Sequence, residues 1–361
     1  MSQKRILIDG REFVKERKTG IARFLEGITG ALIASEFDFD ILLASFDENA
    51  VPSEIKNKPN LVIKKSPPGY LRSEKMLSDL SKQNFSLFIS PYPKLPLFDC
   101  HCPAINTVHD VLDLIHPAYN KRLKAIFDSF RLRTALKKAM TTWYVSASSL
   151  KATESLLGFA GKNPKIRYNA IDERFIAESM DGDSEVIRKY GLETEYILVV
   201  GNGLPHKNLG ILLDISNRLK WALVFAGVSG IQQNFWKSRY PLSQAVWITH
   251  VEDHDLPALI RGAFCLAQPS TAEGYGYPPL EAMACGVPVV VSDIPVLLET
   301  TGYNGLSADP DRPLDWLRAF KSLENPRVNK ERRRLCHMWA NKFRSPNGWE
   351  GHLNDILNSF K

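Results

Sequence analysis

No stretch of the sequence approaches the roughly 20 apolar residues that a membrane-spanning helix needs. The N-terminal segment, MSQKRILIDG, holds no apolar run of the length that a secretory signal requires. Low-complexity tracts are absent as well. These absences predict a folded cytoplasmic protein, and 361 residues favour two domains over one.

Cysteine is scarce and irregularly placed. The five cysteines are an odd number without the spacing of a disulfide framework. Within DCHC (99–102), Cys100, His101 and Cys102 are potential metal ligands, but no second pair of ligands completes a structural zinc site. We therefore expect no disulfide framework, no metal and no cofactor.

Acidic residues are underrepresented in the first half of the chain. Residues 1–170 contain 26 Lys and Arg against 17 Asp and Glu, whereas residues 171–361 contain 20 against 23. A basic lobe suits an anionic partner such as a membrane surface, a phosphorylated lipid or nucleic acid. Scattered basic residues equally fit a solvated surface without a partner. An anionic membrane surface, on the inner face of the cytoplasmic membrane, is kept as a candidate partner, and no nucleic acid is expected.

Short apolar runs, each followed by a loop and a helix-like stretch, recur along the chain. Near-continuous apolar strands that alternate with helices indicate parallel sheets covered on both faces. Because the pattern occurs twice, we predict two doubly wound α/β lobes. The expected strands are 5–9, 40–44, 61–65, 85–90, 104–108, 141–147, 196–200, 222–227, 245–250, 264–270 and 288–293, with a last one near 305.

A polar, acidic segment, RYNAIDERFIAESMDGDSE (167–185), reads as the crossover between the lobes. We expect an N-terminal domain over 1–170, a C-terminal domain over 171–340, and a C-terminal helix over 341–361 that packs on the N-terminal domain. In such sheets ligands bind at the carboxyl ends of the strands. The loops that follow the strands are therefore the place to look for a site.

The first strand of the second lobe leads into a glycine-rich turn, VVGNGLPHKNLGILL (199–213). Backbone N–H groups at such a turn make an anion site. A dinucleotide fingerprint would need a third glycine where the sequence has His206, so a nicotinamide cofactor is disfavoured. Lys207 is expected at the helix start, where its ammonium reaches a phosphate. An exposed lysine near a helix cap is the alternative.

A helix is expected within TAEGYGYPPLEAMACG (271–286). Pro278 and Pro279 fit only a first helical turn, so the helix is predicted to begin there and to end at Gly286. Glu281 is then expected in the first turn, where the helix dipole favours a carboxylate. Dipole compensation alone would account for that residue.

Two glutamates of this segment, Glu273 and Glu281, flank a loop that contains Gly274 and Gly276. Glycine lets a backbone approach a ligand closely, so the loop is expected to direct N–H groups at a diphosphate. The glutamates are either an acid/base pair or a clamp that holds a substrate. Both interpretations stay open at this point.

The stretch 271–293 resembles the signature of glycosyltransferase family 4, whose members are retaining, nucleotide-sugar-dependent enzymes with the GT-B fold. That family carries two glutamates eight positions apart within a glycine- and proline-rich frame, which Glu273 and Glu281 match. GNGLPHKNL (201–209) resembles its phosphate loop, with Lys207 at the lysine position but Asn202 where many members have arginine. Other similar segments are 18–28, 107–117 and 248–270.

The resemblance implies two Rossmann-like domains that face a central cleft, and it assigns site residues. Glu281 is expected to bind the ribose hydroxyls, Glu273 the donor hexose, and His109 the transferred sugar. Alone, His109 also fits a satisfied strand-end histidine, and Asp110 a helix-capping acid. The expected catalytic residues are His109, Glu273 and Lys207, the donor-binding residues are Gly20, Asn202, Lys207, Val251, Gly274, Tyr275, Gly276, Tyr277 and Glu281, and the acceptor-side residues are Arg23 and Asp110.

The function that the resemblance implies is hexosyl transfer in bacterial surface polysaccharide synthesis. GDP-mannose is the favoured donor and a UDP-hexose the next, with a glycan or lipid-linked glycan as the acceptor. No divalent ion is expected, since the triplets DFD (38–40) and DPD (309–311) fit turns better than a metal site. The alternatives are a non-catalytic nucleotide-sugar-binding protein and, less favoured, a glycoside hydrolase that uses Glu273 and Glu281.

Overall fold

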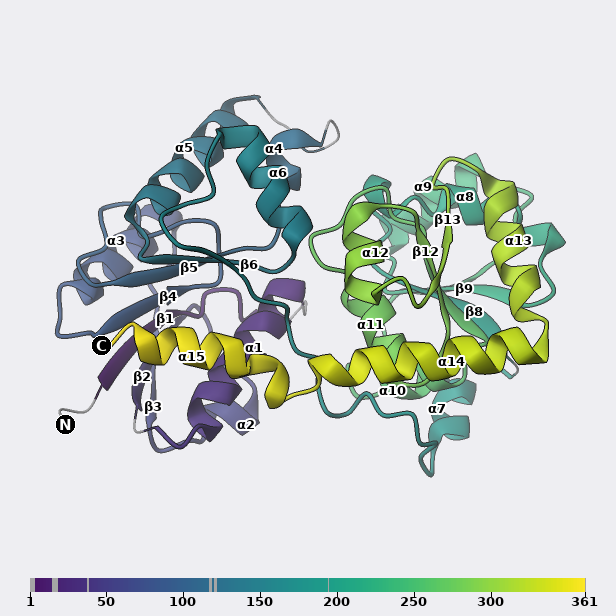
Figure 1. The fold of residues 1–361 in the computed structure, drawn as a ribbon, viewed down its shortest axis with the longest axis horizontal. Coiled ribbons are helices and arrows are strands. Elements are labelled where there is room, and N and C mark those ends of the chain that lie inside the picture. Colours follow the sequence, from purple (N-terminus) through teal and green to yellow (C-terminus); the bar gives the residue numbers. More distant parts are fainter. Residues whose placement is uncertain are drawn as a thin grey trace. The chain divides into compact units, whose positions relative to one another are not determined.

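The computed structural model describes residues 4–14, 19–37, 39–116, 119, 122–193 and 195–360. The chain divides into two compact units, each with its own parallel sheet (Figure 1). Unit 1 is Met1–Ala170 with Ser345–Lys361, and unit 2 is Ile171–Arg344. The chain passes from unit 1 to unit 2 after Ala170 and returns after Arg344, so its last helix belongs to unit 1.

Unit 1 is built on a sheet of seven parallel strands within the described residues, in the order β3-β2-β1-β4-β5-β6-β7. Six of these strands were predicted, and β7 was not. The strands are β1 (Lys4–Asp9), β2 (Phe39–Ser45), β3 (Leu61–Lys65), β4 (Leu87–Ser90), β5 (Ala104–Val108), β6 (Thr141–Tyr144) and β7 (Pro164–Ile166). The helices are α1 (Gly20–Ala34), α2 (Ser53–Lys56), α3 (Tyr70–Ser81), α4 (Leu112–Ile115), α5 (Arg122–Lys138), α6 (Ala147–Leu157) and α15 (Glu350–Asn358).

Helix α1 lies on the sheet of unit 1 through one apolar face. Phe24, Leu25 and Ile28 are fully buried in a cluster that also contains Trp349, just before α15. Gly27 lets that tryptophan approach, because a Cβ at this position would overlap the indole ring. The core of unit 1 is therefore completed by residues from the far end of the chain.

The carboxylate of Asp355 anchors α15 to unit 1. It accepts hydrogen bonds from the Trp143 indole at 2.9 Å, from Lys165 at 2.7 Å and from Arg167 at 2.8 Å. Burial by itself would raise the pKa of Asp355, but hydrogen bonds from Arg167, Lys165 and Trp143 hold that pKa below its usual value. The helix is thus fixed by an ionised group as well as by apolar packing.

Unit 2 has a six-stranded parallel sheet within the described residues, in the order β10-β9-β8-β11-β12-β13. Its strands are β8 (Tyr196–Val200), β9 (Ala222–Ala226), β10 (Val246–Ile248), β11 (Cys265–Gln268), β12 (Val289–Ser292) and β13 (Leu306–Ala308). Its helices are α7 (Asp183–Lys189), α8 (Gly210–Leu213), α9 (Gly230–Arg239), α10 (Leu256–Arg261), α11 (Tyr277–Ala284), α12 (Pro295–Thr301), α13 (Pro313–Leu323) and α14 (Pro326–Ala340).

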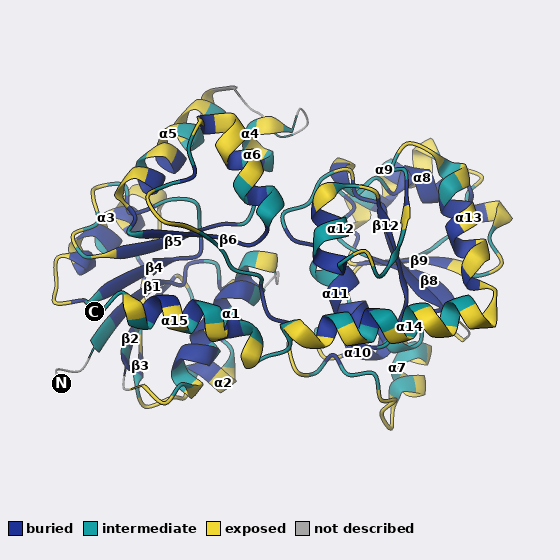
Figure 2. Cartoon of the chain, in the orientation of Figure 1, coloured by how far each residue is buried: buried dark blue, intermediate teal, exposed yellow. Residues whose placement is uncertain are grey.

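The central strands of both sheets are buried along most of their length, as Figure 2 shows. This burial explains why their sequences read as continuous apolar runs and not as alternating ones. The two predicted doubly wound lobes are confirmed. In each sheet the direction of winding reverses once, between β1 and β4 in unit 1 and between β8 and β11 in unit 2.

Candidate functional site

The reversal between β8 and β11 brings together two loops of unit 2 that lie far apart in the sequence. Loops at such a point diverge from the carboxyl edge and leave a crevice in which ligands bind. The loop after β8 contains Asn202 and Lys207, and the loop after β11 contains Glu273. The carbonyl oxygen of His206 joins the two loops, since it accepts a hydrogen bond from the Thr271 amide at 2.8 Å.

The turn after β8 is not the direct start of an α-helix. Residues Pro205–Lys207 form a short 3₁₀ turn, and α8 begins at Gly210. Lys207 therefore precedes the α-helix and does not open it, which corrects the expectation from the sequence. The reason is Asn208, whose φ of 51° ends the 3₁₀ turn in the left-handed region. The Oδ1 atom of Asn202 accepts a hydrogen bond from the Leu204 amide at 3.2 Å, so this side chain shapes the turn.

Glu273 is the centre of the polar contacts at this edge. Its Oε1 atom accepts hydrogen bonds from Lys207 Nζ at 2.6 Å, Gln268 Nε2 at 2.6 Å and Ser270 Oγ at 2.7 Å. Burial alone would raise the pKa of Glu273, but the charge of Lys207 and these hydrogen bonds hold it below the usual range. Glu273 is therefore ionised at neutral pH and holds the Lys207 ammonium in place.

Helix α11 begins one residue earlier than the sequence suggested. Gly276 precedes it with a φ of 95°, and a Cβ there would lie 2.8 Å from Leu297, so only glycine fits. The helix starts at Tyr277, which places Pro278 and Pro279 second and third in its first turn. Glu281 is therefore the fifth helical residue and not part of the first turn, contrary to expectation. It is 2% exposed, so it is not a surface residue that compensates the dipole.

The aromatic residues around the glycine loop pack on one another. The rings of Tyr275 and Tyr277 meet edge to face, with centroids 5.2 Å apart. Gly274 stands half-buried directly after Glu273. Val251, also half-buried, lies in a separate loop of unit 2 between β10 and α10. The predicted donor-binding glycines and tyrosines of unit 2 and Glu281 thus belong to one segment, residues 274–281. Val251 lies in a different loop, which follows β10 of the same sheet.

His109 follows β5 at the carboxyl edge of the sheet of unit 1. Its Nε2 atom lies 3.1 Å from the Pro91 carbonyl oxygen, and its ring meets Phe24 edge to face. Because a carbonyl oxygen only accepts, Nε2 carries the hydrogen and Nδ1 keeps a lone pair. Burial lowers the pKa of His109 to about 4, against the hydrogen bond to Pro91. His109 is therefore a neutral imidazole at pH 7, with Nδ1 as an acceptor.

The remaining predicted residues of unit 1 lie at the starts of two helices. Gly20 is the first residue of α1, and Thr19 caps it by accepting a hydrogen bond from the Ala22 amide at 3.0 Å. Arg23 is half-buried in the first turn of α1. The Oδ1 atom of Asp110 accepts a hydrogen bond from the Leu112 amide at 2.9 Å, at the start of α4. Asp110 thus makes the capping contact that was its alternative interpretation.

A network of buried charges at the reversal between β1 and β4 was not predicted. Arg11 donates to Asp9 at 2.8 Å and to Glu74 at 2.9 Å, and Arg131 donates to Glu74 at 2.9 Å. Glu74 is fully buried; burial would raise its pKa, but Arg11 and Arg131 hold it below the usual value. Lys94 lies 4.7 Å from the centre of the Tyr92 ring, and burial lowers its pKa.

The sequence carries one signal for part of this network. Asp9 ends the first strand and Arg11 follows Gly10, whereas Lys94 lies in the loop after the fourth strand. Charged residues at the ends of two buried strands indicate a polar carboxyl edge of the sheet. Glu74 and Arg131 carry no such signal, because they come from the interiors of α3 and α5.

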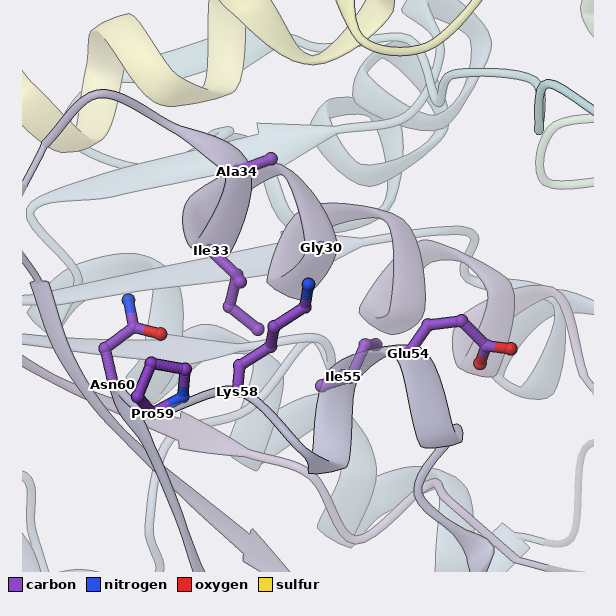
Figure 3. Close-up of a pocket in the computed structure, with 8 residues that line it drawn as sticks. All are labelled: Gly30, Ile33, Ala34, Glu54, Ile55, Lys58, Pro59 and Asn60. Carbon is purple, nitrogen blue, oxygen red and sulfur yellow. The ribbon is translucent and has the colours of Figure 1, made fainter.

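A cavity of about 430 Å³ opens on unit 1, between α1 and the segment from α2 to β3 (Figure 3). Lys58, Pro59 and Asn60 line it, and they precede β3. The cavity therefore lies at the amino edge of the sheet, opposite the loops that hold His109 and Arg11. It is separate from the candidate site.

Comparison with known proteins finds a family match within unit 2. Residues 184–341 match the family model described as glycosyl transferases group 1. The chain is 31% identical over 219 residues to O-antigen chain mannosyltransferase B of Escherichia coli, and the aligned region covers 58% of each chain. It is 27% identical over 226 residues to O-antigen chain mannosyltransferase RfbU of Salmonella typhimurium, which covers 60% of each.

The fold matches over a longer range than the sequence does. The structure of Anabaena Alr3699/HepE in complex with UDP and glucose superimposes with a TM-score of 0.78 at 18% identity, over 99% of this chain and 100% of that one. The expected GT-B fold is thereby confirmed. By sequence, the chain spans 58% and 60% of the length of the two curated relatives.

Proposed function

We propose that this chain transfers a hexose from a nucleotide sugar to a glycan, a proposal supported by the match of residues 184–341 to the family model described as glycosyl transferases group 1. One observation carries the proposal. Lys207 and Glu273, from two different strand ends, are in contact at 2.6 Å beside the glycine loop that opens α11. This combination places a fixed cation and backbone N–H groups at the reversal point of the sheet.

The leaving group of such a reaction is a nucleoside diphosphate, and charge develops on it as the glycosidic bond breaks. Preorganised donors at that position lower the barrier. We assign this task to the Lys207 ammonium and to the amides of Gly274–Gly276. No divalent ion is part of the proposal.

Three residues receive further roles in the proposal. Glu281 binds the ribose hydroxyls, and Glu273 steadies Lys207 through Oε1 while it contacts the donor hexose. His109 accepts a hydrogen bond from a hydroxyl of the transferred sugar through Nδ1, which suits its neutral state. The acceptor hydroxyl attacks on the face that the diphosphate leaves and loses its proton to a phosphate oxygen, so that configuration is retained.

GDP-mannose is the donor that we favour, with a UDP-hexose next. The two curated relatives are named as O-antigen chain mannosyltransferases, which supports mannose. The structural neighbour with bound UDP supports the alternative. The acceptor in the proposal is a glycan, carried on a lipid, of a bacterial surface polysaccharide. Arg23 and Asp110 are assigned to its side of the reaction.

Thermal unfolding in the presence of GDP, UDP, GDP-mannose and UDP-glucose tests the donor. A ligand that binds only the folded protein raises Tm in proportion to the logarithm of its concentration. We expect GDP and GDP-mannose to raise Tm and the uridine compounds to raise it less. The Lys207→Ala variant should lose the Tm shift. The control variant is Lys321→Ala, which replaces an exposed lysine on α13 and should keep the shift.

If none of the nucleotides stabilises the protein, the proposal is wrong. A shift without sugar transfer would favour the non-catalytic binding protein.

The placement of the two glutamates weakens the hydrolase alternative. A glycoside hydrolase needs carboxyl groups that flank the glycosidic bond. Glu273 and Glu281 belong to one loop and helix of unit 2, and Lys207 occupies Oε1 of Glu273. Release of sugar from a glycan without any nucleotide sugar would reverse this assignment.

A further inference from the structure

Gln268 is a buried glutamine at the end of β11, next to the candidate site of unit 2. It is 1% exposed. Its Nε2 atom donates hydrogen bonds to Glu273 Oε1 at 2.6 Å and to Ser270 Oγ at 2.8 Å. The Ser270 hydroxyl donates to the same oxygen of Glu273 at 2.7 Å. The network thus converges on one carboxylate oxygen of Glu273.

The two carboxylate oxygens of Glu273 are used unequally. Oε1 accepts the hydrogen bonds from Gln268 and Ser270 and a third from Lys207 at 2.6 Å. Within the described residues Oε2 accepts none, and 11% of the side chain is exposed. A carboxylate oxygen offers about two lone-pair sites, so Oε1 is fully occupied. Because an ionised carboxylate only accepts, Oε2 is the atom that remains for a donor on a ligand.

The carbonyl end of the Gln268 side chain has no partner. Its Oε1 atom is buried and accepts no hydrogen bond from the described part of the chain. A buried acceptor without a donor is costly and rare in folded proteins. The reverse orientation of the amide would be worse, because it would direct the carbonyl oxygen at the Glu273 carboxylate. A side chain that destabilises its own surroundings is expected where the residue serves a site.

We propose that Gln268 is a positioning residue that sets which oxygen of Glu273 faces the donor sugar. It holds Oε1 toward β11 and Lys207, so that Oε2 is presented to a sugar hydroxyl. Glutamine suits this task, since it supplies a donor without adding a charge to the ion pair of Lys207 and Glu273. The proposal rests on the proposed function for the identity of the ligand, whereas the hydrogen bonds that orient Glu273 do not depend on it.

Replacement of Gln268 by glutamate tests this orientation through pH. In Gln268→Glu two carboxyl groups face each other, so the folded variant keeps a proton that the unfolded chain loses above about pH 4.3. Its stability relative to the wild type should therefore be nearly unchanged near that pH and should fall as the pH rises. Lys207 and His206 also act on Glu273, and Glu281 lies on α11, which packs on β11. These groups are the same in the wild type, which is the reference at each pH.

A swap of the two side chains separates their interaction from other effects. Gln268→Glu/Glu273→Gln keeps one carboxylate and one amide at the two positions. Its denaturation midpoint at pH 8 should recover most of what Gln268→Glu loses, as expected for two residues in contact. The control for the added charge is Gln244→Glu at an exposed position of unit 2, which should have the midpoint of the wild type at both pH 5 and pH 8.

Transfer kinetics test the role in the reaction. Gln268→Met has a side chain of similar length that neither donates nor ionises, and it should lower kcat by up to about 10²-fold at every pH. The KM for the donor and the nucleotide-induced Tm shift should change little, because Lys207 and the glycine loop remain. Gln268→Glu should recover kcat as the pH falls, since its protonated carboxyl group donates as the amide does. The swap should stay slow, because its carboxylate no longer faces the sugar.

Three results would overturn the proposal. The first is a stability loss of Gln268→Glu that is the same at pH 5 and pH 8. The second is a swap variant that is no more stable than Gln268→Glu at pH 8. The third is an unchanged kcat of Gln268→Met in a chain that transfers sugar. If the wild type transfers no sugar, the proposed function fails, and the denaturation midpoints still decide whether Gln268 orients Glu273.

Discussion

The two units have the same kind of sheet but differ at the point where the winding reverses. In unit 2 the loops at this point carry Gly276 in the left-handed region and one ion pair, Lys207 with Glu273. In unit 1 the equivalent point is filled by the Arg11 and Glu74 network. One edge thus combines a glycine-rich loop with a single ion pair, and the other is filled by a network of buried charged side chains. Strand topology locates an edge, but the residues in its loops decide what the edge does.

Removal of the charge on Glu74 should have the largest effect. The Glu74→Gln variant leaves Arg11 and Arg131 buried without a full counter-charge, which costs about 3–5 kcal/mol. Hydrogen exchange of the β1 and β4 amides measures the loss in unit 1. Asp79→Asn, which breaks only exposed pairs with Lys75 and Lys82, should leave exchange unchanged. Unchanged exchange in Glu74→Gln would mean that the network does not stabilise the edge.

Removal of the cation at the other edge should affect turnover most, and it should also cost some stability in unit 2, because Glu273 loses its counter-charge. We expect Lys207→Ala to lower kcat about 10²–10³-fold, as the loss of one preorganised donor does. Steady-state transfer from the donor found by thermal shift measures this, with Lys321→Ala as the control. Full activity of Lys207→Ala would remove the central residue of the proposed mechanism. The proposed difference between the two edges, one that stabilises its unit and one that serves turnover, would then be wrong.

Two glycines of α1, Gly27 and Gly30, test how much the contact between α1 and the C-terminal segment stabilises unit 1. Gly27→Ala should destabilise unit 1 by about 1–3 kcal/mol, because the new methyl group overlaps Trp349. Gly30→Ala meets nothing within 4 Å, so it should stabilise the helix by about 0.5–1 kcal/mol. Chemical denaturation followed by tryptophan fluorescence compares the two variants. Equal effects would show that contact with the C-terminal segment is unimportant.

The last prediction concerns the pH dependence of the free energy of unfolding of unit 1. Burial, together with the charge of Arg167, lowers the pKa of His352 to about 3, although Asp355 opposes this. The unfolded chain binds a proton below about pH 6.5 and the folded chain does not, so stability is complete above that pH and falls as pH decreases. The slope is at most about 1.4 kcal/mol per pH unit for each such histidine, and His109, whose pKa burial lowers to about 4, contributes in the same direction. Denaturation midpoints from pH 7 to 5 should show the full slope in the wild type and in His101→Gln, and a smaller slope, due to His109, in His352→Phe.

Most strands were predictable because each is buried on both faces and therefore reads as an unbroken apolar run. The strand β7, with the sequence PKI, was missed because an edge strand of three residues has no such run. Sequence reasoning also selected Lys207 and Glu273 as candidates, since both lie in loops that follow a strand. Their mutual contact was not expected, because the sequence separates them by 66 residues.

Side-chain networks were the part that could not be predicted. Glu74 and Arg131 come from helix interiors, 57 residues apart, and no local pattern pairs them. The helical position of Glu281 was wrong by one residue, which moves it out of the first turn, because two prolines suggested the helix start. The glycine before them, with its left-handed conformation, sets the start instead. Predictions held where burial fixed the pattern and failed where distant side chains meet.

The return of the chain to unit 1 has a consequence for its synthesis. Trp349 and Ile356 belong to the core of unit 1, yet they leave the ribosome after every residue of unit 2. Unit 2 is contiguous and has all its strands once Arg344 has emerged. Unit 1, although it begins first, waits for α15 before its core is closed. The first domain to start is thus the last to finish, and during translation unit 2 is the one able to fold first.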